Sequence, residues 1–238
     1  MSTFLYGVAL QWKLDMRSKS LLITCYVVPF IFFLLMGGIF ISIMPEMEST
    51  LIPSMIVMGV SMGSFLGLPS TLIETYASNI KKVYKANGVP LYLGLATMFL
   101  SAFTHQMIMC AIMVVLAPII FDAALPTSLP LFILALAIYI AVSLSIGCIL
   151  GLAVKNQAKL TMIAQLVFLP SIMLSGIMFP IDLLPETFEL IGEFFPASWG
   201  YRLMLNNGFQ FDHLWYLLLV LFTAAIVCTL LLNRHKCK

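Results

Sequence analysis

Long uncharged apolar segments alternate with short polar connections along this chain of 238 residues. A helix needs about 20 apolar residues to cross a hydrocarbon layer of roughly 30 Å. Six segments approach or exceed that length: residues 21–43, 51–73, 91–121, 129–154, 160–179 and 214–232. The strict apolar–polar alternation typical of a membrane β-barrel is missing. The pattern therefore predicts an all-α integral membrane protein with six transmembrane helices in one domain over residues 1–238. The third segment exceeds one crossing, so we expect its start to lie in the interface.

The composition agrees with a membrane location. Charged residues make up 9% of the chain and apolar residues 62%, whereas soluble domains carry roughly 25% charged residues. The mean hydropathy is +1.08. So few charges cannot cover a water-soluble surface, which excludes a soluble enzyme, a nucleic-acid binder and a disordered chain. The five cysteines show no metal or redox spacing, and the four inside apolar segments are expected to be small buried side chains.

The distribution of charge predicts the orientation. If the N-terminus is cytoplasmic, 11 of the 12 Lys and Arg residues fall in cytoplasmic segments, and Arg202 alone falls outside. Eight of the ten carboxylates fall on the outer side, and Asp15 and Glu74 stay inside. Because cytoplasmic connections carry an excess of Lys and Arg, both termini are predicted to be cytoplasmic in a multi-pass plasma-membrane protein.

The N-terminal stretch 4–19 has helical amphipathic spacing. One face carries Leu5, Val8, Ala9, Trp12 and Met16, and Asp15 with Lys19 is predicted to form an i,i+4 pair. We expect this helix to lie in the cytoplasmic interface. It is either a membrane-surface anchor only or also a contact surface for a soluble partner.

The largest cytoplasmic connection is residues 74–90, which favour a helix through Lys85 and then end it at Asn87-Gly88. Two interpretations are open: a solvated basic loop, or a short helix that docks on another protein. In the second case Glu74, Ile80, Val83 and Tyr84 are the candidate docking residues.

The outer connection 180–212 is too polar to cross and too apolar to be a simple linker. A helix is predicted from Pro185 to Pro196 and a second one from Ser198 to Asn206. The first helix separates three glutamates, at positions 186, 189 and 193, from an apolar face of Phe188, Ile191 and Phe195. We expect this apolar face to rest on the outer ends of spans five and six as an external lid.

Motifs for catalysis are weak in this chain. No G-x-x-x-x-G-K-[S/T] phosphate loop occurs. Residues 59–63 match G-x-S-x-G, but within an apolar helix, so the repeat Gly59, Gly63, Gly67 indicates close helix packing rather than a Ser61 nucleophile paired with His105. His105, Gln106 and Gln165 are the main polar side chains at membrane depth, and they either bond between helices or line a substrate path.

Residues 174–200 resemble the corresponding segment of type-2 ABC-transporter permeases. Members typically show S-G-x-x-F-P near the end of span five, then L-P and a later Pro; here these are Ser175-Gly176, Phe179-Pro180, Leu184-Pro185 and Pro196. The length and predicted topology of the whole chain agree with the family. Many members open the loop between spans two and three with E-R-E-x-G-T, of which this chain keeps only Glu74.

The resemblance implies a permease subunit of an exporter driven by a separate ATP-binding-cassette ATPase, which would hold ATP and Mg²⁺. It implies two permease halves, as a homodimer or heterodimer, around a path lined chiefly by spans two and five. Ser61, Phe65, Gln165 and Phe168 are then path candidates, with His105 as a further one. A hydrophobic or amphipathic cargo is expected, with no cofactor, metal or nucleic acid bound by this chain. The alternative is an intramembrane enzyme or a non-transporting assembly factor.

Overall fold

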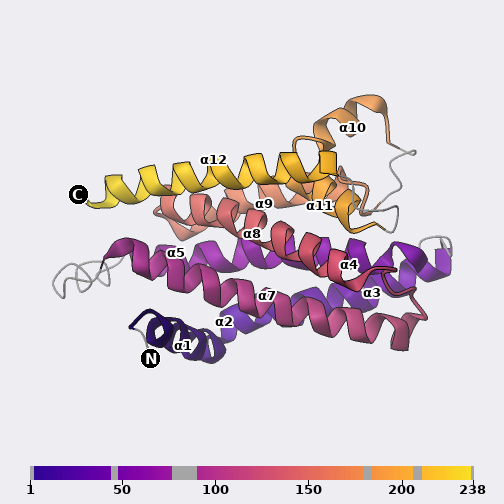
Figure 1. Cartoon of the computed structure of the whole chain (residues 1–238), viewed down its shortest axis with the longest axis horizontal. Coiled ribbons are helices and arrows are strands. Elements are labelled where there is room, and N and C mark those ends of the chain that lie inside the picture. Colours follow the sequence, from indigo (N-terminus) through magenta and orange to yellow (C-terminus); the bar gives the residue numbers. More distant parts are fainter. Residues whose placement is uncertain (1–2, 44–47, 77–89, 179–183, 206–210, 237–238) are drawn as a thin grey trace.

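The computed structural model describes residues 3–43, 48–76, 90–178, 184–205 and 211–236, and this part of the chain is helical without any strand. Figure 1 shows the helices packed side by side in one elongated bundle. In chain order they are α1 (Thr3–Arg17), α2 (Lys19–Leu22), the π-helical η1 (Ile23–Val27), α3 (Val28–Ile43), α4 (Leu51–Met62), the π-helical η3 (Gly63–Gly67), α5 (Leu68–Tyr76), α7 (Leu91–Phe121), α8 (Leu129–Ala153), α9 (Gln157–Met173), α10 (Glu186–Gly192), α11 (Pro196–Met204) and α12 (Phe211–Lys236).

Five of these helical segments are long and apolar enough to cross a membrane, counted over the described residues. They are Lys19–Ile43, Leu51–Tyr76, Leu91–Phe121, Leu129–Ala153 and Asp212–Arg234. The remaining predicted span, 160–179, is α9, which has 17 residues and ends at Met173. It ends early because Gly176, with φ of 78°, turns the chain in a backbone conformation that only glycine adopts without strain. The structure is therefore an all-α membrane protein with five long spans and a shorter α9.

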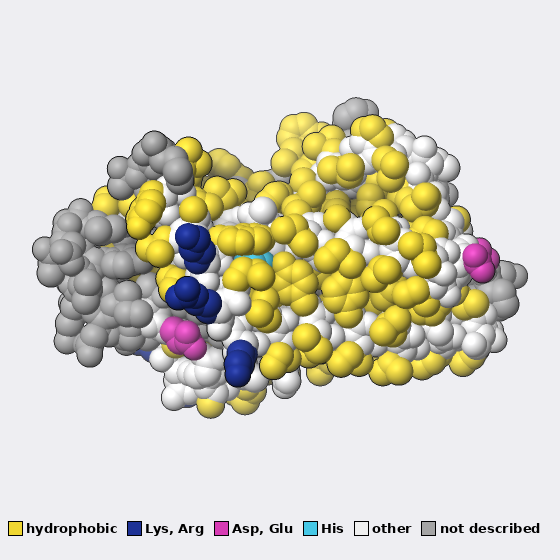
Figure 2. Space-filling model, turned by 90° about the horizontal axis from the view of Figure 1, so that it is seen from below, with side chains coloured by type: hydrophobic (Ala, Val, Ile, Leu, Met, Phe, Trp, Pro, Cys, Tyr) yellow, Lys and Arg dark blue, Asp and Glu magenta, His cyan; other side chains and the backbone are white. Residues whose placement is uncertain are grey.

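The two ends of the bundle differ in charge. In Figure 1, α1, the end of α5 and the C-terminal part of α12 lie at one end, and α10 lies at the other. On the face drawn in Figure 2, Lys and Arg side chains gather near one end, whereas apolar side chains cover most of the remaining surface. An apolar belt beside a basic end is the surface that a bilayer-embedded protein presents.

The second span, α4 to α5, lies in the centre of the bundle, and small residues allow its neighbours to approach. A Cβ added to Gly147 of α8 would lie 2.1 Å from the Ser64 carbonyl oxygen, and one added to Gly151 would lie 2.8 Å from Leu72 Cβ. Gly63 and Gly67 are similarly covered by Gln106 and the Cys25 thiol. The small residues thus serve helix packing, as their spacing predicts.

Two prolines explain the two π-helical segments. The π-helical segment η1 ends two residues before Pro29, and η3 ends two residues before Pro69. A proline inside a helix has no N–H to donate, and its ring collides with the carbonyl group four residues earlier. Widening the helix by one residue relieves that collision and leaves carbonyl groups without their usual donor. The first and second spans therefore carry matched irregularities, and these two segments pack against each other.

Candidate functional site

A cavity of about 270 Å³ lies between the first span, the second span and α9. A smaller hollow of about 30 Å³ adjoins it, because the two share Thr24, Leu66 and Ser70 as lining residues. We call the two together the groove. Its larger part is otherwise lined by Val28, Met62, Phe65, Leu160, Thr161, Ala164 and Gln165, and its smaller part by Ser18, Ser20, Leu21, Gly67, Thr71 and Glu74.

The groove changes character along its length. Its larger part is mainly aliphatic and aromatic, and its smaller part is rich in hydroxyl groups. Three of these hydroxyls donate to carbonyl groups of their own helices: Thr24 to Ser20 at 3.0 Å, Ser70 to Leu66 at 3.0 Å and Thr71 to Leu68 at 2.8 Å. Their oxygen lone pairs remain as acceptors, and Ser70 Oγ also accepts a bond from Gln157 Nε2 at 2.9 Å. An apolar part beside a polar part suits an amphipathic molecule.

The π-helical segments form part of the groove wall. Thr24 belongs to η1, whereas Phe65 and Leu66 belong to η3. Such π-bulges occur frequently at functional sites, since they redirect side chains and free backbone carbonyl groups. Pro29 and Pro69 follow the two irregular segments at the same spacing, but Pro118 and Pro170 lie inside α7 and α9 without such a segment, so a proline alone does not show in the sequence where a helix widens.

The predicted path residues are divided among several places. Phe65 and Gln165 line the groove together, and their role in a translocation path stays a prediction. Phe168, one turn along α9 from Gln165, is buried in the apolar core. Ser61 is buried away from the groove, where its hydroxyl donates to the Val57 carbonyl at 2.8 Å and shares a 2.6 Å bond with the Tyr139 hydroxyl. The structure thus brings two of the five candidates into one cavity.

The predicted docking residues are only partly placed. Glu74 does not lie in a separate segment; it is an exposed residue of the last turn of α5 and lines the smaller part of the groove. Ile80, Val83 and Tyr84 lie outside the described residues. The docking prediction for residues 74–90 therefore stays a prediction.

The nucleophile hypothesis for Ser61 is not supported by the geometry. Ser61 bonds to Tyr139 and Val57, while His105 Nδ1 lies 2.8 Å from the Tyr26 hydroxyl. No bond joins Ser61 to His105, and among the described residues no group of three His, Cys, Asp or Glu side chains could hold a metal. The four cysteines in the described part of the chain are buried and free.

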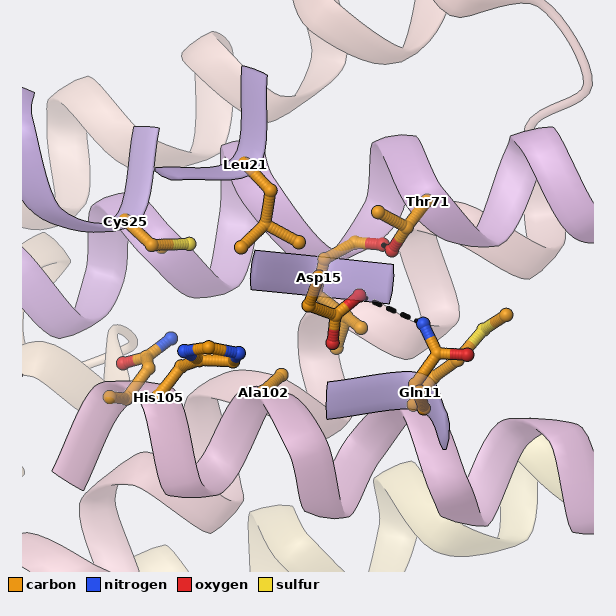
Figure 3. Close-up of a pocket in the computed structure, with 11 residues that line it drawn as sticks. Gln11, Asp15, Leu21, Cys25, Thr71, Ala102 and His105 are labelled. Carbon is orange, nitrogen blue, oxygen red and sulfur yellow. Dashed lines mark hydrogen bonds between the residues drawn. The ribbon is translucent and has the colours of Figure 1, made fainter. Parts of the chain in front are cut away.

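The N-terminal helix α1 is docked on α7, which the sequence did not predict. The predicted pair of Asp15 with Lys19 is wrong: the Asp15 carboxylate instead accepts bonds from Ser101 Oγ of α7 and, at 2.8 Å, from Gln11 Nε2. Figure 3 shows Asp15 of α1 and His105 of α7 pointing toward the same cavity. Burial raises the pKa of the Asp15 carboxyl above its usual range, and the bonds from Ser101 and Gln11 partly oppose that change.

The predicted apolar face of α1 is also only partly correct. Val8 and Trp12 are half-buried, whereas Leu5 and Met16 are exposed and available to lipid. The side of the helix that packs on α7 is the one with Trp12 and Asp15, because a carboxylate can be buried only where it finds hydrogen-bond donors.

The outer connection folds as two short helices with different surroundings from those predicted. Phe188 and Ile191 of α10 are 47% and 46% exposed, so the expectation that they pack onto spans five and six is wrong. The close contact of α10 with the bundle is instead made by Gly192: a Cβ added to this residue would lie 2.1 Å from the Leu174 carbonyl oxygen. Phe195 is partly covered. The apolar face of α10 is therefore not held down by the bundle.

The second of these helices, α11, begins at Pro196 rather than after it and is largely buried among α4, α8, α9 and α12. Arg202 of α11 pairs with Glu193 at 3.0 Å and lies over the Trp199 ring. The only basic residue that the sequence assigns to the outer side thus holds α11 against the end of α10. Two of the three glutamates, Glu189 and Glu193, are thus partners of Arg202 as well as exposed to solvent.

The comparison with protein families matches residues 44–233 to the model of the ABC-2 family transporter protein. The match covers most of the chain and includes the second span, α9 and both outer helices. No curated protein matches the chain. The Ser175-Gly176 pair on which the resemblance partly depends lies in the turn that ends α9. The chain therefore belongs to the ABC-2 family of transporter proteins, as a membrane-embedded permease subunit of an ABC transporter.

Proposed function

We propose that this permease moves an amphipathic or hydrophobic substrate outward along the groove, driven by ATP hydrolysis on a separate ATP-binding-cassette subunit. The observation that supports this most directly is the joint lining of the groove by Phe65 and Met62 of the second span and Gln165 of α9. Methionine and aromatic side chains adapt to cargo of varied shape. The hydroxyl-rich part of the groove offers partners for the polar end of an amphipathic molecule.

A six-span topology with both termini in the cytoplasm belongs to this proposal. At 17 residues α9 is about 26 Å long, close to the thickness of a thin bilayer. Residues 174–178, of which 175–177 are buried, continue it beyond the helix end. The one-sided distribution of Lys and Arg supports the cytoplasmic placement of both ends in the plasma membrane.

The ATPase and a second permease half are the partners that this function needs. These 238 residues contain no phosphate loop, and we therefore assign ATP hydrolysis to a separate ATP-binding-cassette subunit. The connection 74–90 is the proposed docking element. The second half can be a copy of this chain or a related permease.

The proposed experiment introduces a large side chain into the groove from α9. Gln165→Trp places a large ring in the larger part of the groove, while Leu166→Trp places the same ring on an exposed position of α9. We expect Gln165→Trp to lower ATP-dependent efflux of an amphipathic fluorescent dye by about tenfold, because the indole ring occupies part of the groove that the dye would need; a tenfold loss corresponds to about 1.4 kcal/mol. Efflux is measured in proteoliposomes that contain the permease and its ATPase, at equal permease content.

Leu166→Trp should leave efflux near the wild-type rate, since its ring faces the outside of the bundle. Equal losses in the two variants would show that the groove has no special role in transport. Dye efflux that needs neither ATP nor the ATPase would contradict the energy source instead.

A further inference from the structure

A buried polar cluster joins α1 to the middle of the bundle. His105 is 1% exposed and Asp15 is 5% exposed, although both side chains are titratable. The Trp12 ring stacks on the His105 imidazole with 3.9 Å between ring centroids and 3° between planes. Because Trp12 and Asp15 belong to α1, the cluster exists only while α1 is docked on α7.

One polar atom in this cluster has no partner. His105 Nδ1 is engaged by the Tyr26 hydroxyl at 2.8 Å, but the buried His105 Nε2 has no hydrogen-bond partner. If Tyr26 donates to Nδ1, then Nε2 carries the proton and needs an acceptor; in the other tautomer Nε2 needs a donor. Either state leaves a buried polar group without a partner unless something binds it.

The same cavity supplies room for such a partner. It is lined by His105 and Asp15 together with Gln11, Leu21, Cys25, Gly63, Leu68, Thr71, Met98, Ala102 and Gln106, and its volume is about 10 Å³ (Figure 3). That is the space that one water molecule occupies, and it is too small for an organic ligand. A metal is disfavoured as well, because the described residues offer no set of three metal-ligating side chains.

We propose that Asp15, His105 and one water molecule in this cavity form a proton-binding site that holds α1 on α7. The docked pair carries one shared proton, either on the carboxyl group or on the imidazole. In both forms the pair is electrically neutral overall, which makes its burial tolerable. When α1 leaves α7, Asp15 enters water as a carboxylate, and the shared proton passes to water from whichever of the two groups carried it.

Among the described residues, no other charged group neutralises the Asp15 carboxylate in place of this proton. The η1 segment contributes the neutral Cys25 thiol and the Tyr26 hydroxyl, and α5 contributes the uncharged Thr71. Among the described residues of α1, α2 and α5, the other charges are on the exposed side chains of Lys13, Arg17, Lys19 and Glu74. Within the described part of the chain, none of them forms an ion pair with Asp15.

The direction of the pH dependence follows from the burial of Asp15. Its pKa is higher in the docked state than in water, so docked α1 binds more protons than free α1. Docking is strongest at low pH and weakens as the pH rises from the ordinary Asp value, about 3.9, toward the raised one. One proton changes the docked-to-free ratio by at most about tenfold per pH unit.

Docking of α1 also affects the wall of the groove that the first span forms. α1 continues through Ser18 into α2 and η1, and Ser18, Thr24 and Val28 all line the groove. Release of α1 therefore loosens the first-span wall of the groove. This inference does not depend on the proposed substrate or on the direction of transport.

The test measures docking in the full-length chain in lipid nanodiscs. Spin labels on Leu14→Cys of α1 and Val115→Cys of α7, both exposed positions, report the distance between the helices by pulsed electron resonance. Cys237 is replaced by serine, and the other native cysteines are buried. Between about pH 4.5 and about pH 8.5 we expect a longer distance to gain population, by up to tenfold per unit.

Three variants decide the result. Asp15→Asn, which is permanently neutral and can still accept from Ser101, should show the short distance at every pH and so also report correct folding. Lys13→Gln, an exposed charge on the same helix, should keep the wild-type dependence. His105→Gln should shift the midpoint. A distance that is constant with pH in the wild type, or an equal slope in Asp15→Asn, would overturn the proposal, and an unchanged midpoint in His105→Gln would remove His105 from it.

Discussion

The second and the last spans show that burial in this protein does not follow hydropathy. The most apolar window of Leu51–Tyr76 has a mean hydropathy of 1.8 and is 94% buried, whereas that of Asp212–Arg234 has a higher value of 2.5 and is 17% buried. In water the more apolar helix would be the inner one. In a bilayer, lipid is as apolar as leucine, so helix association depends on close packing and on bonds between polar groups.

The side chains of the two spans reflect this difference. The second span carries Ser61 and Ser64, which bond to neighbouring helices through Tyr139 and Gln106, with Oγ of Ser64 lying 2.9 Å from the Gln106 amide. In the last span the hydroxyls of Thr223 and Thr229 bond only within their own helix. Among the described residues, its bonds to other elements are the exposed one from Tyr216 to the Phe194 carbonyl and the weak one from the Cys228 thiol to the Ser145 carbonyl. Polar groups between helices therefore mark the buried span better than its hydropathy does.

Truncating one leucine in each of the two spans is expected to give the largest difference in unfolding free energy that tests this contrast in burial. Leu72 of α5 is 0% exposed, and Leu219 of α12 is 61% exposed. Leu72→Ala should lower the free energy of unfolding by about 2–5 kcal/mol, because it leaves a cavity that its neighbours cannot fill. Leu219→Ala should change it by less than about 0.5 kcal/mol, because lipid chains refill the space. Reversible unfolding in mixed micelles of increasing SDS content measures both.

Similar losses in the two variants would mean that α12 is covered in the assembled transporter, for instance by the second permease half. That outcome would contradict lipid exposure of the last span without affecting the central position of the second span.

The sequence predicted the positions of the spans, because these depend on local composition. It did not predict the features that depend on the folded backbone or on contacts between residues far apart in the chain. Positions 51–73 and 129–154 were assigned nearly as the structure has them, because apolar length is a local property. The early end of α9 depends on the positive φ of Gly176, which a hydropathy window cannot detect. The π-helical segments are followed by Pro29 and Pro69, but Pro118 and Pro170 lie inside regular α-helices, so a proline alone does not reveal such a segment in the sequence.

The candidate site was predicted only in part for the same reason. Phe65 and Gln165 were found through the family resemblance, which assigns spans two and five to the path. The burial of Asp15 could not be predicted, because its partner Ser101 is 86 residues away and the nearby Lys19 offered a plausible local pair. Likewise, nothing near Phe188 shows that Gly192 makes the contact that holds α10.

A smaller effect is expected from adding one methyl group to a glycine. Gly147→Ala would force α8 away from the second span, since the new Cβ would lie 2.1 Å from a backbone oxygen that cannot rotate away. We expect a loss of about 1–3 kcal/mol in the same unfolding assay. The control is Gly38→Ala in the first span, where nothing lies within 4 Å of the new Cβ. The control should be neutral or slightly stabilising, because alanine favours a helix by about 1 kcal/mol. A neutral Gly147→Ala would show that α8 and the second span are not in close backbone contact.

The smallest effect concerns one hydroxyl group between α8 and the second span. Tyr139→Phe removes the 2.6 Å bond to Ser61, while the Ser61 hydroxyl keeps its bond to the Val57 carbonyl. Because no buried group loses its last partner, the expected loss is about 0.5–1 kcal/mol, the usual value of a hydrogen bond between membrane helices. Tyr216→Phe in the last span removes the 2.7 Å bond to the Phe194 carbonyl, which is exposed, and should cost less because water can replace the hydroxyl. A larger loss of unfolding free energy in Tyr216→Phe than in Tyr139→Phe would show that the polar bonds of the last span contribute more than those of the second span. Buried polar contacts could then no longer explain why the second span lies at the centre.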